Sequence, residues 1–253
     1  MRIKYSKEIE YIAKKILLPE KFLLKRRLQR AIDNNYEIEL GILNKIVNKN
    51  LESIDVGVYR GVYTYKLAEI SKHVHSFEPN PLIFPYLEKH LKKIVKNVTL
   101  YNTALSDKKN EVDLKIPKRF NTINKNDYEQ KYKLGCATIH EKNMLEDKEY
   151  ITKKVKTDTL DELLKDKKIG FIKIDVEGHE KNVLMGSKNL ISQCKPNMLV
   201  EIEERHTNEK VANIINFINS FGYKSYYCNE SDLVSTDKLS NYNIKHNYIF
   251  IHQ

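Results

Sequence analysis

Four ionisable side chains stand within six positions at the end of an apolar run. The stretch GFIKIDVEGHEKNVLMGS, residues 170–187, places there Asp175, Glu177, His179 and Glu180. Side chains alternate along a strand, so Asp175 and Glu177 share one side, and Gly178 permits a sharp turn into a helix. An imidazole ordinarily titrates near neutral pH, which favours His179 as a general base. We expect Asp175, Glu177 and His179 to be catalytic residues.

Two of these assignments have structural alternatives. His179 can equally be a capping residue that moves no proton. Glu177 or Glu180 can simply supply negative charge to the first turn of the helix, and this is the role expected for Glu180. Asp175 is expected to hold either a cofactor or an acceptor hydroxyl. Lys173 is expected to play a structural role, with its ammonium near a carboxylate or at the sheet periphery.

A second group of residues follows an earlier apolar run, in DVGVYRG. Gly57 and Gly61 allow a tight bend in which the backbone, including that of Tyr59, comes close to a ligand. The bend lacks the middle glycine of the dinucleotide fingerprint, and Asp55 would place negative charge beside a pyrophosphate, which argues against NAD or a flavin. A cofactor with a positive sulfonium, such as S-adenosylmethionine, suits this carboxylate better.

Two further strand ends complete the predicted cofactor site. Glu78, in FEPNP, can accept hydrogen bonds from both hydroxyls of an adenosine ribose. In YNTALSD, the small Ala104 and the polar Asn102 and Thr103 fall where an adenine ring would lie. Asp55, Gly57, Tyr59, Gly61 and Glu78 join these three residues as the expected cofactor-binding set.

The elements that must position these residues alternate between strand and helix. Short apolar runs from about Leu51 onward alternate with helical periods, which is typical of βαβ units around a parallel sheet. Strands are predicted at 51–57, 73–79, 98–105, 111–117, 153–158, 170–176 and 196–203, and the last two, 222–229 and 246–253, suit an edge hairpin. Helices are predicted from about Gly61 and at 81–94, 159–164, 179–191 and 208–220, with Thr159 and Glu162 as a capping box.

The length and composition of the chain indicate which class of protein to expect. At 253 residues, with 31% charged and 41% hydrophobic residues, the chain fits one soluble α/β domain, predicted at 51–253, with an N-terminal extension at 1–50. Three widely spaced cysteines suggest neither a disulfide framework nor a zinc site. With no apolar run long enough to span a bilayer and no signal-peptide core, we expect a cytoplasmic protein. The irregular segment 118–148 is expected to form a functional loop or lid.

The net charge of +10 is concentrated in the N-terminal extension. Its apolar residues recur at helical spacing among lysines and arginines, and Pro19 is expected to divide it into two helices. We expect these helices to cap the core with a solvated basic face; peripheral contact with anionic lipid is the alternative. Nucleic acid ranks lower, because no RNP-type or helix-turn-helix pattern accompanies the charge.

Taken together, these segments resemble the FkbM family of S-adenosylmethionine-dependent methyltransferases. DVGVYRG, FEPNP, NTALSD, TDTLDELL, FIKIDVEGHEKNVLMGS, LVEIE and NYIFI occur in that family's order, and the KIDVEGHE match is highly specific. The resemblance implies the class I methyltransferase fold, a Rossmann-like, mostly parallel seven-strand sheet with helices on both faces and an antiparallel edge hairpin. It also implies O-methylation of a small acceptor, usually a sugar or a related metabolite. The family's turn usually resembles DVGANIG, whereas Val58, Tyr59 and Arg60 stand here.

Three alternatives stay open. Asp175 and Glu201 can share a Mg²⁺ with Glu203 as a third ligand, although metal-free catalysis ranks ahead. A non-catalytic module that keeps the nucleoside-binding fold and contacts an anionic surface through its basic N-terminus is the main alternative function. A nicotinamide-dependent oxidoreductase is disfavoured by Asp55. The acceptor's identity and the oligomeric state are not indicated by any residue pattern.

Overall fold

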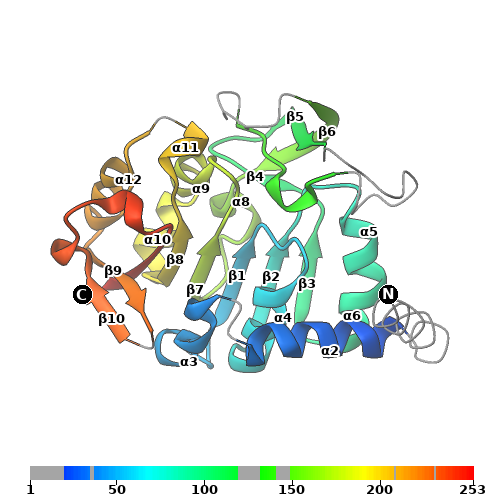
Figure 1. Ribbon diagram of the computed structural model, residues 1–253, viewed down its shortest axis with the longest axis horizontal. Coiled ribbons are helices and arrows are strands. Elements are labelled where there is room, and N and C mark those ends of the chain that lie inside the picture. The colour runs from blue at the N-terminus through cyan, green and yellow to red at the C-terminus, as the bar shows by residue number, and fades with distance from the viewer. Residues whose placement is uncertain (1–19, 35–36, 119–131, 141–148, 208, 231) are drawn as a thin grey trace, which may run out of the picture.

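The structure is a computed structural model that describes residues 20–34, 37–118, 132–140, 149–207, 209–230 and 232–253 (Figure 1). Its centre is an eight-stranded sheet in the order β10-β9-β11-β8-β7-β1-β2-β3. The strands are β1 (Glu52–Val56), β2 (His73–Phe77), β3 (Val98–Tyr101), β7 (Ile169–Ile174), β8 (Asn197–Glu201), β9 (Tyr223–Asn229), β10 (Asp232–Ser235) and β11 (Asn247–His252).

The predicted mixture of parallel and antiparallel pairing is confirmed. The pairs β1–β2, β1–β7, β2–β3 and β7–β8 are parallel, whereas β8–β11, β11–β9 and β9–β10 are antiparallel. The expected number of seven strands is wrong. An eighth strand, β10, forms because Asp232–Ser235 turns back and pairs with β9, a segment too short and too polar to be recognised in the sequence.

A second, three-stranded sheet lies above the carboxyl ends of the central strands (Figure 1). It has the order β4-β6-β5 and consists of β4 (Ala104–Leu105), β5 (Asn110–Pro117) and β6 (Tyr150–Asp158). The strand expected at 98–105 is therefore two strands, because Asn102 and Thr103 interrupt it and β4 pairs with β6 instead. The segment 118–148, expected to be a functional loop, lies largely outside the described residues.

Helices cover both faces of the main sheet. They are α2 (Glu20–Asp33), α3 (Leu43–Ile46), α4 (Val62–Ile70), α5 (Phe84–Tyr86), α6 (Lys92–Ile94), α8 (Leu160–Leu163), α9 (Glu180–Met185), α10 (Lys188–Cys194), α11 (Glu204–Thr207) and α12 (Val211–Asn219). Shorter turns are the π-helical η2 (Leu87–Leu91), which joins α5 to α6, and the 3-10 turns η1 (Ile38–Gly41), η3 (Leu134–Cys136), η4 (Thr236–Lys238) and η5 (Tyr242–Ile244).

Two helix predictions differ in detail from the structure. The helix expected at 179–191 is broken between α9 and α10 at Gly186, where a Cβ atom would lie 2.0 Å from the backbone oxygen of Ser106. Backbone contact between two segments therefore requires a glycine there. The N-cap at Thr159 is confirmed, since its hydroxyl accepts a 3.2 Å hydrogen bond from the backbone N–H of Glu162.

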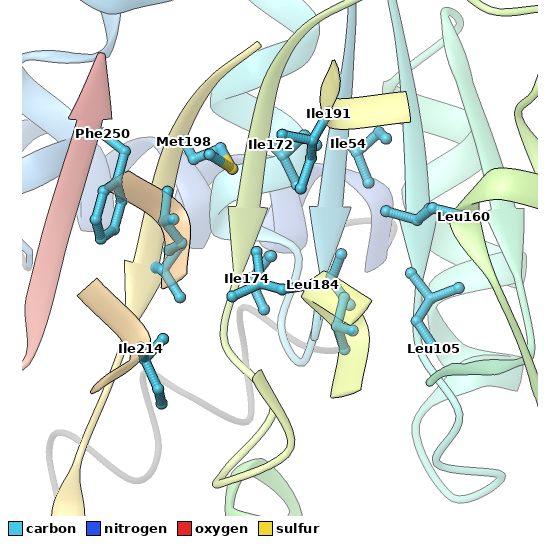
Figure 2. Close-up of a cluster of buried hydrophobic side chains, with 14 of the residues drawn as sticks. Ile54, Leu105, Leu160, Ile172, Ile174, Leu184, Ile191, Met198, Ile214 and Phe250 are labelled. Carbon is cyan, nitrogen blue, oxygen red and sulfur yellow. The ribbon is translucent and has the colours of Figure 1, made fainter. Parts of the chain in front are cut away.

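Successive side chains of the central strands point to opposite faces of the sheet, and both faces belong to the core. Ile172 and Ile174 pack with Ile54, Met198 and residues of α9, α10 and α12 on one face (Figure 2). Phe171 points to the opposite face, into a cluster with residues of α3 and α4. Both faces of the central strands are thus buried, as the near-continuous apolar runs predict.

The N-terminal segment packs directly on this core. Helix α2 buries Leu24 and Leu28 against α4 and η2, while residues of η1 and α3 join the cluster around Phe171. One hydrophobic cluster therefore includes residues on both sides of position 50, and the division into 1–50 and 51–253 stays a prediction. Residues 1–19, including Pro19, lie outside the described residues.

Candidate functional site

A cleft of about 670 Å³, counting its open mouth, lies between the carboxyl ends of β1, β2 and β7 and the second sheet. The predicted site residues among its lining are Gly57, Tyr59, Glu78, Thr103, Ala104, Asp175, Glu177 and His179. Asp55, Gly61 and Asn102 are not part of that lining.

The opposite wall consists of residues that the sequence did not single out. Leu114 of β5 and four residues around η3 form this wall, namely Leu134, Gly135, Ala137 and Ile139. The alternation of the β5 segment indicated a half-buried strand, but nothing in its pattern placed it over the cleft. Segment 134–139 has no periodicity, so its position depends on tertiary packing alone.

The turn after β1 is shaped by contacts within the protein. Gly57 has a φ of +85°, and a Cβ atom there would lie 1.8 Å from the backbone oxygen of Asp175, so only glycine fits. Tyr59 also adopts a positive φ, of 47°. Its ring packs against Gly135 and carries the guanidinium of Arg60 at 5.1 Å. Gly61, with a φ of +80°, begins α4 and approaches Leu91 rather than the cleft.

Glu78 is held at the end of β2 by two backbone donors. The N–H of Tyr59 donates to Oε2 at 2.8 Å, and the N–H of Asn80 donates to Oε1 at 2.9 Å. Burial raises the pKa of Glu78 to about 7, although both hydrogen bonds act in the opposite direction. Each carboxylate oxygen keeps a free lone pair for a ligand hydroxyl. Asn102 donates at 2.8 Å to the backbone oxygen of Glu78 and so supports this strand end from outside the cleft.

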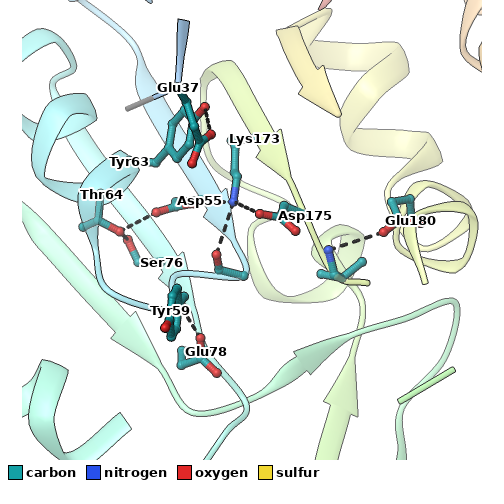
Figure 3. A network of polar contacts seen from close by, with 12 residues as sticks. Glu37, Asp55, Tyr59, Tyr63, Thr64, Ser76, Glu78, Lys173, Asp175 and Glu180 are labelled. Carbon is teal, nitrogen blue, oxygen red and sulfur yellow. Dashed lines mark hydrogen bonds and ion pairs between the residues drawn. The ribbon is translucent and has the colours of Figure 1, made fainter. Parts of the chain in front are cut away.

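Lys173 joins two of the predicted carboxylates (Figure 3). Its ammonium lies 2.9 Å from Oδ2 of Asp175 and 3.9 Å from Oδ1 of Asp55, and it donates to the backbone oxygen of Gly57 at 3.3 Å. Burial alone lowers the pKa of Lys173, but the two carboxylates outweigh it and hold that pKa above its ordinary value. Lys173 is therefore near carboxylates, as one of the two expectations had it.

Asp55 lies behind the cleft wall and not on it. Its residue is 0% exposed, and its Oδ2 accepts a 2.6 Å hydrogen bond from Thr64 of α4. Oδ1 has no hydrogen-bond partner among the described residues and faces Lys173. Burial raises the pKa of Asp55, opposed by Lys173. The direct cofactor contact expected for Asp55 does not fit this position, because both oxygens face the protein interior.

Asp175 and Glu201 are a coupled pair of carboxyl groups at the carboxyl ends of β7 and β8. Burial and the charge of Asp175 raise the pKa of Glu201 to about 11. Burial also acts to raise the pKa of Asp175, but the Lys173 ammonium and a hydrogen bond from Glu201 together outweigh it and lower that pKa. Glu201 is thus the neutral member and Asp175 the ionised one. Glu203 pairs with Arg205, whose Nη2 lies 3.0 Å from Oε1. In the described parts of the chain, no three His, Cys, Asp or Glu side chains form a group suited to a metal ion.

The two acidic residues that follow have different environments. Glu177 lies 3.2 Å from Nε2 of His206, and burial together with the charge of Asp175 raises its pKa to about 8. Glu180 is buried and accepts a 2.9 Å hydrogen bond from the N–H of Gly178. Glu180 therefore stabilises the turn before α9, close to the structural role expected for it.

His179 lies at the first position before α9 and is 9% exposed. Its Nε2 is 2.9 Å from the hydroxyl of Ser106, and its Nδ1 has no hydrogen-bond partner among the described residues. Burial and the nearby ring of His140 lower the pKa of His179 to about 4, so its imidazole is neutral at physiological pH. His179 makes no side-chain capping hydrogen bond.

The sequence was compared with known protein families. Residues 55–225 match the model of the methyltransferase FkbM domain. The chain belongs to the FkbM methyltransferase family. Among curated protein sequences, none matches the chain. In the described parts of the chain, no helix has the length and apolar character needed to cross a bilayer.

The chain is similar to several solved structures. The FkbM methyltransferase from Methylobacillus flagellatus KT is 15% identical, with a TM-score of 0.51 over 80% of this chain and 44% of its own. The chain thus spans less than half of that relative. An rRNA methylase from Streptococcus thermophilus is 11% identical, with a TM-score of 0.45 over 85% of this chain and 95% of its own. A magnesium protoporphyrin IX methyltransferase from Synechocystis is 9% identical, with a TM-score of 0.45 over 89% and 79%. The class I methyltransferase fold predicted from the sequence is confirmed.

Proposed function

We propose that the protein is an S-adenosylmethionine-dependent O-methyltransferase whose acceptor is a hydroxyl of a small molecule, a sugar or a glycan-related metabolite. One observation carries this proposal: the carboxylates of Glu78 and Asp175, at the ends of two different parallel strands, line the same cleft. Ligands of open α/β sheets bind beyond the carboxyl ends of the strands. Glu78 offers acceptor oxygens for ribose hydroxyls, and the ionised Asp175 suits a positively charged group of the same ligand.

The residues present fit S-adenosylmethionine. Glu78 would accept hydrogen bonds from the ribose hydroxyls, because its two oxygens are each engaged by only one backbone donor. Thr103 and Ala104 would lie against the adenine, and Asp175 would face the positively charged methionine end. Bound there, the cofactor supplies an electrophilic methyl group whose leaving sulfur needs no protonation.

The chain's own task is then to orient the acceptor and remove its proton. His179 is the base in this proposal, because its imidazole is neutral and its buried Nδ1 is without a partner among the described residues. A local movement has to expose this nitrogen to the acceptor. Asp175 is ionised and a third exposed, so it can accept a hydrogen bond from the acceptor. Glu177 would bind a neighbouring hydroxyl. Several carboxyl groups around one cleft suit an acceptor with several hydroxyls, as a sugar has.

Calorimetric titration with S-adenosylmethionine tests the cofactor part. We expect saturable binding that Glu78→Gln weakens about 10- to 100-fold, since hydrogen bonds to a charged group contribute about 1.5–3 kcal/mol each. The matched control is Glu88→Gln, whose carboxylate on the surface of η2 is 56% exposed. Absence of binding by the wild-type protein, or equal affinity of both variants, would refute the assignment.

A screen of glycosides with isotopically labelled S-adenosylmethionine tests the acceptor part. Labelled methyl ethers should form with the wild-type protein, and His179→Gln should lower kcat about 10²- to 10⁴-fold, the range of general-base catalysis. Labelled product on RNA or on a porphyrin, with none on any glycoside, would contradict the acceptor class while retaining the methyltransferase.

The exposed face of α2 favours a second candidate function, attachment to an anionic surface. Leu24 and Leu28 are buried, while the exposed side chains of this helix include Lys21, Lys25, Arg26, Arg27 and Arg30. Basic side chains on one helix face attract anionic headgroups within a Debye length. Sedimentation with vesicles containing phosphatidylserine should carry down the protein, with loss of binding in high salt. Equal sedimentation with pure phosphatidylcholine would argue against this function.

A further inference from the structure

A chain of three polar side chains leads away from the cleft behind His179. Nε2 of His179 lies 2.9 Å from Oγ of Ser106, and Oγ of Ser106 lies 2.9 Å from Oδ1 of Asp107. Ser106 is 7% exposed, whereas Asp107 is at the surface. Because His179 and Ser106 are both buried, no water can replace the hydrogen bond between the imidazole and the serine hydroxyl.

The donor and the acceptor in each of these hydrogen bonds follow from which of the three groups carries a proton. The pKa of Asp107 lies below its ordinary value, because hydrogen bonds from Ser106 and Asn182 outweigh its slight burial. Asp107 is therefore an ionised acceptor, and the single hydroxyl proton of Ser106 is donated to it. Ser106 can then only accept from His179, which requires the proton of the neutral imidazole to be on Nε2. Nδ1 is left as the nitrogen with the free lone pair.

The backbone holds Ser106 in place for this role. Its N–H donates to the backbone oxygen of Asp158 at 2.9 Å, which ties the end of β4 to β6. On the other side, the missing side chain of Gly186 lets the backbone of Ser106 approach the end of α9, the helix that His179 precedes. The separation between the serine hydroxyl and the imidazole is thus set by two elements of regular structure.

We propose that Ser106 and Asp107 are positioning residues that hold His179 in the Nε2–H tautomer and leave the buried Nδ1 as the nitrogen able to accept a proton. The inference rests on the proposed function, in which His179 is the base. In that reaction the acceptor O–H bond breaks, its proton forms a bond to Nδ1, and the oxygen keeps the electron pair for its new bond to the methyl carbon. The imidazolium then donates from Nε2 to Ser106 while Asp107 stays ionised.

The charged and titratable groups around His179 are consistent with this arrangement. His140 stands at a ring-centroid distance of 5.9 Å in an edge-on geometry, and it disfavours a positive charge on His179. Asp107 acts in the opposite direction and raises the pKa of His179. Asp107 is thus the group that favours the charged intermediate state of the base, although it does not line the cleft.

Nuclear magnetic resonance of protein labelled with ¹⁵N-histidine shows which ring nitrogen of His179 carries the proton, and it needs neither cofactor nor acceptor. In the wild-type protein at neutral pH we expect the His179 proton entirely on Nε2, with the signal assigned through His179→Gln. Ser106→Ala and Asp107→Ala should each introduce a population protonated on Nδ1, since the first removes the acceptor and the second frees the serine proton. Asp107→Ala should also lower the pKa of His179. His75, which pairs with Glu52 at 2.7 Å, serves as an internal reference that neither variant shifts.

The outcomes separate this inference from the proposed function. A wild-type His179 protonated on Nδ1, or one whose tautomer is unchanged in Asp107→Ala, overturns the inference even if S-adenosylmethionine binds. Loss of cofactor binding by the wild-type protein overturns the proposed function even if the tautomer is as expected. Should Ser106→Ala not fold, the wild-type spectrum and the surface substitution Asp107→Ala still decide. Ser71→Ala, which removes a buried hydroxyl bonded to Ser53 at 2.6 Å, is the control for stability effects alone.

Discussion

Replacing Lys173 with methionine removes the cation between Asp55 and Asp175 while preserving most of the side-chain volume. The Lys173 side chain is 6% exposed and that of Asp55 is 1% exposed, so the Asp55 carboxylate is left in the interior without a counter-charge. Asp175, with 33% of its side chain exposed, can recover solvation and contributes less. Removing one partner of a buried pair costs about 3–5 kcal/mol. For a protein of this size, that corresponds to a loss in Tm of roughly 6–20 °C.

Urea denaturation followed by circular dichroism measures this loss. The double substitution Lys173→Met with Asp55→Asn should recover part of the stability, because the uncompensated charge is then gone. The control is Lys167→Met, whose ammonium is 45% exposed and 4.0 Å from Glu52, a surface pair that contributes about 1 kcal/mol or less. Our reasoning is refuted if Lys173→Met is as stable as the control, or if the double variant is no more stable than Lys173→Met.

Two further predictions concern the cleft. Burial raises the pKa of Glu177 to about 8, so the folded state binds the Glu177 proton more tightly than the unfolded state does. The contribution of this proton to the free energy of unfolding is complete below about pH 4.3 and is lost as the pH rises toward 8. Glu177→Gln should therefore flatten the decline in unfolding free energy between those values, and an unchanged slope would contradict the shift. Gly57→Ala should lower Tm far more than Gly135→Ala, because the first Cβ meets the backbone oxygen of Asp175 at 1.8 Å and the second meets only the Tyr59 ring at 3.0 Å; equal Tm values would argue against the turn geometry.

The cleft-lining residues that could be predicted are those that follow strands directly. Glu78 and Asp175 come immediately after buried apolar runs, His179 follows in the turn after Asp175, and the carboxyl ends of parallel strands meet at one edge of a sheet. This rule places a residue at the edge but does not tell which way its side chain points. Asp55 lies inside β1, one residue before its end, and Thr64 and Lys173 hold its side chain on the interior side. Its burial depends on partners from α4 and β7 that no local pattern reveals.

Proton positions were equally inaccessible to sequence reasoning. An imidazole at the start of a helix suggested a base of ordinary pKa, whereas burial beside His140 lowers the pKa of His179 to about 4. The Ser106–Asp107 pair directly follows the strand predicted at 98–105, and the sequence assigned it no role. Its distance from His179 along the chain, 73 residues to Ser106, hides the contact.

By itself, the sequence determined the order of strands and helices, the parallel sheet and the family, because these depend on local periodicity and on short runs of residues that stay together in any fold. Only the tertiary structure decided what the carboxylates do. Lys173 reaches the backbone of Gly57 across 116 residues, and the second sheet closes the cleft with side chains from segments without periodicity. Charge states in the cleft depend on desolvation and on distances between such remote groups, and neither quantity exists until the chain is folded.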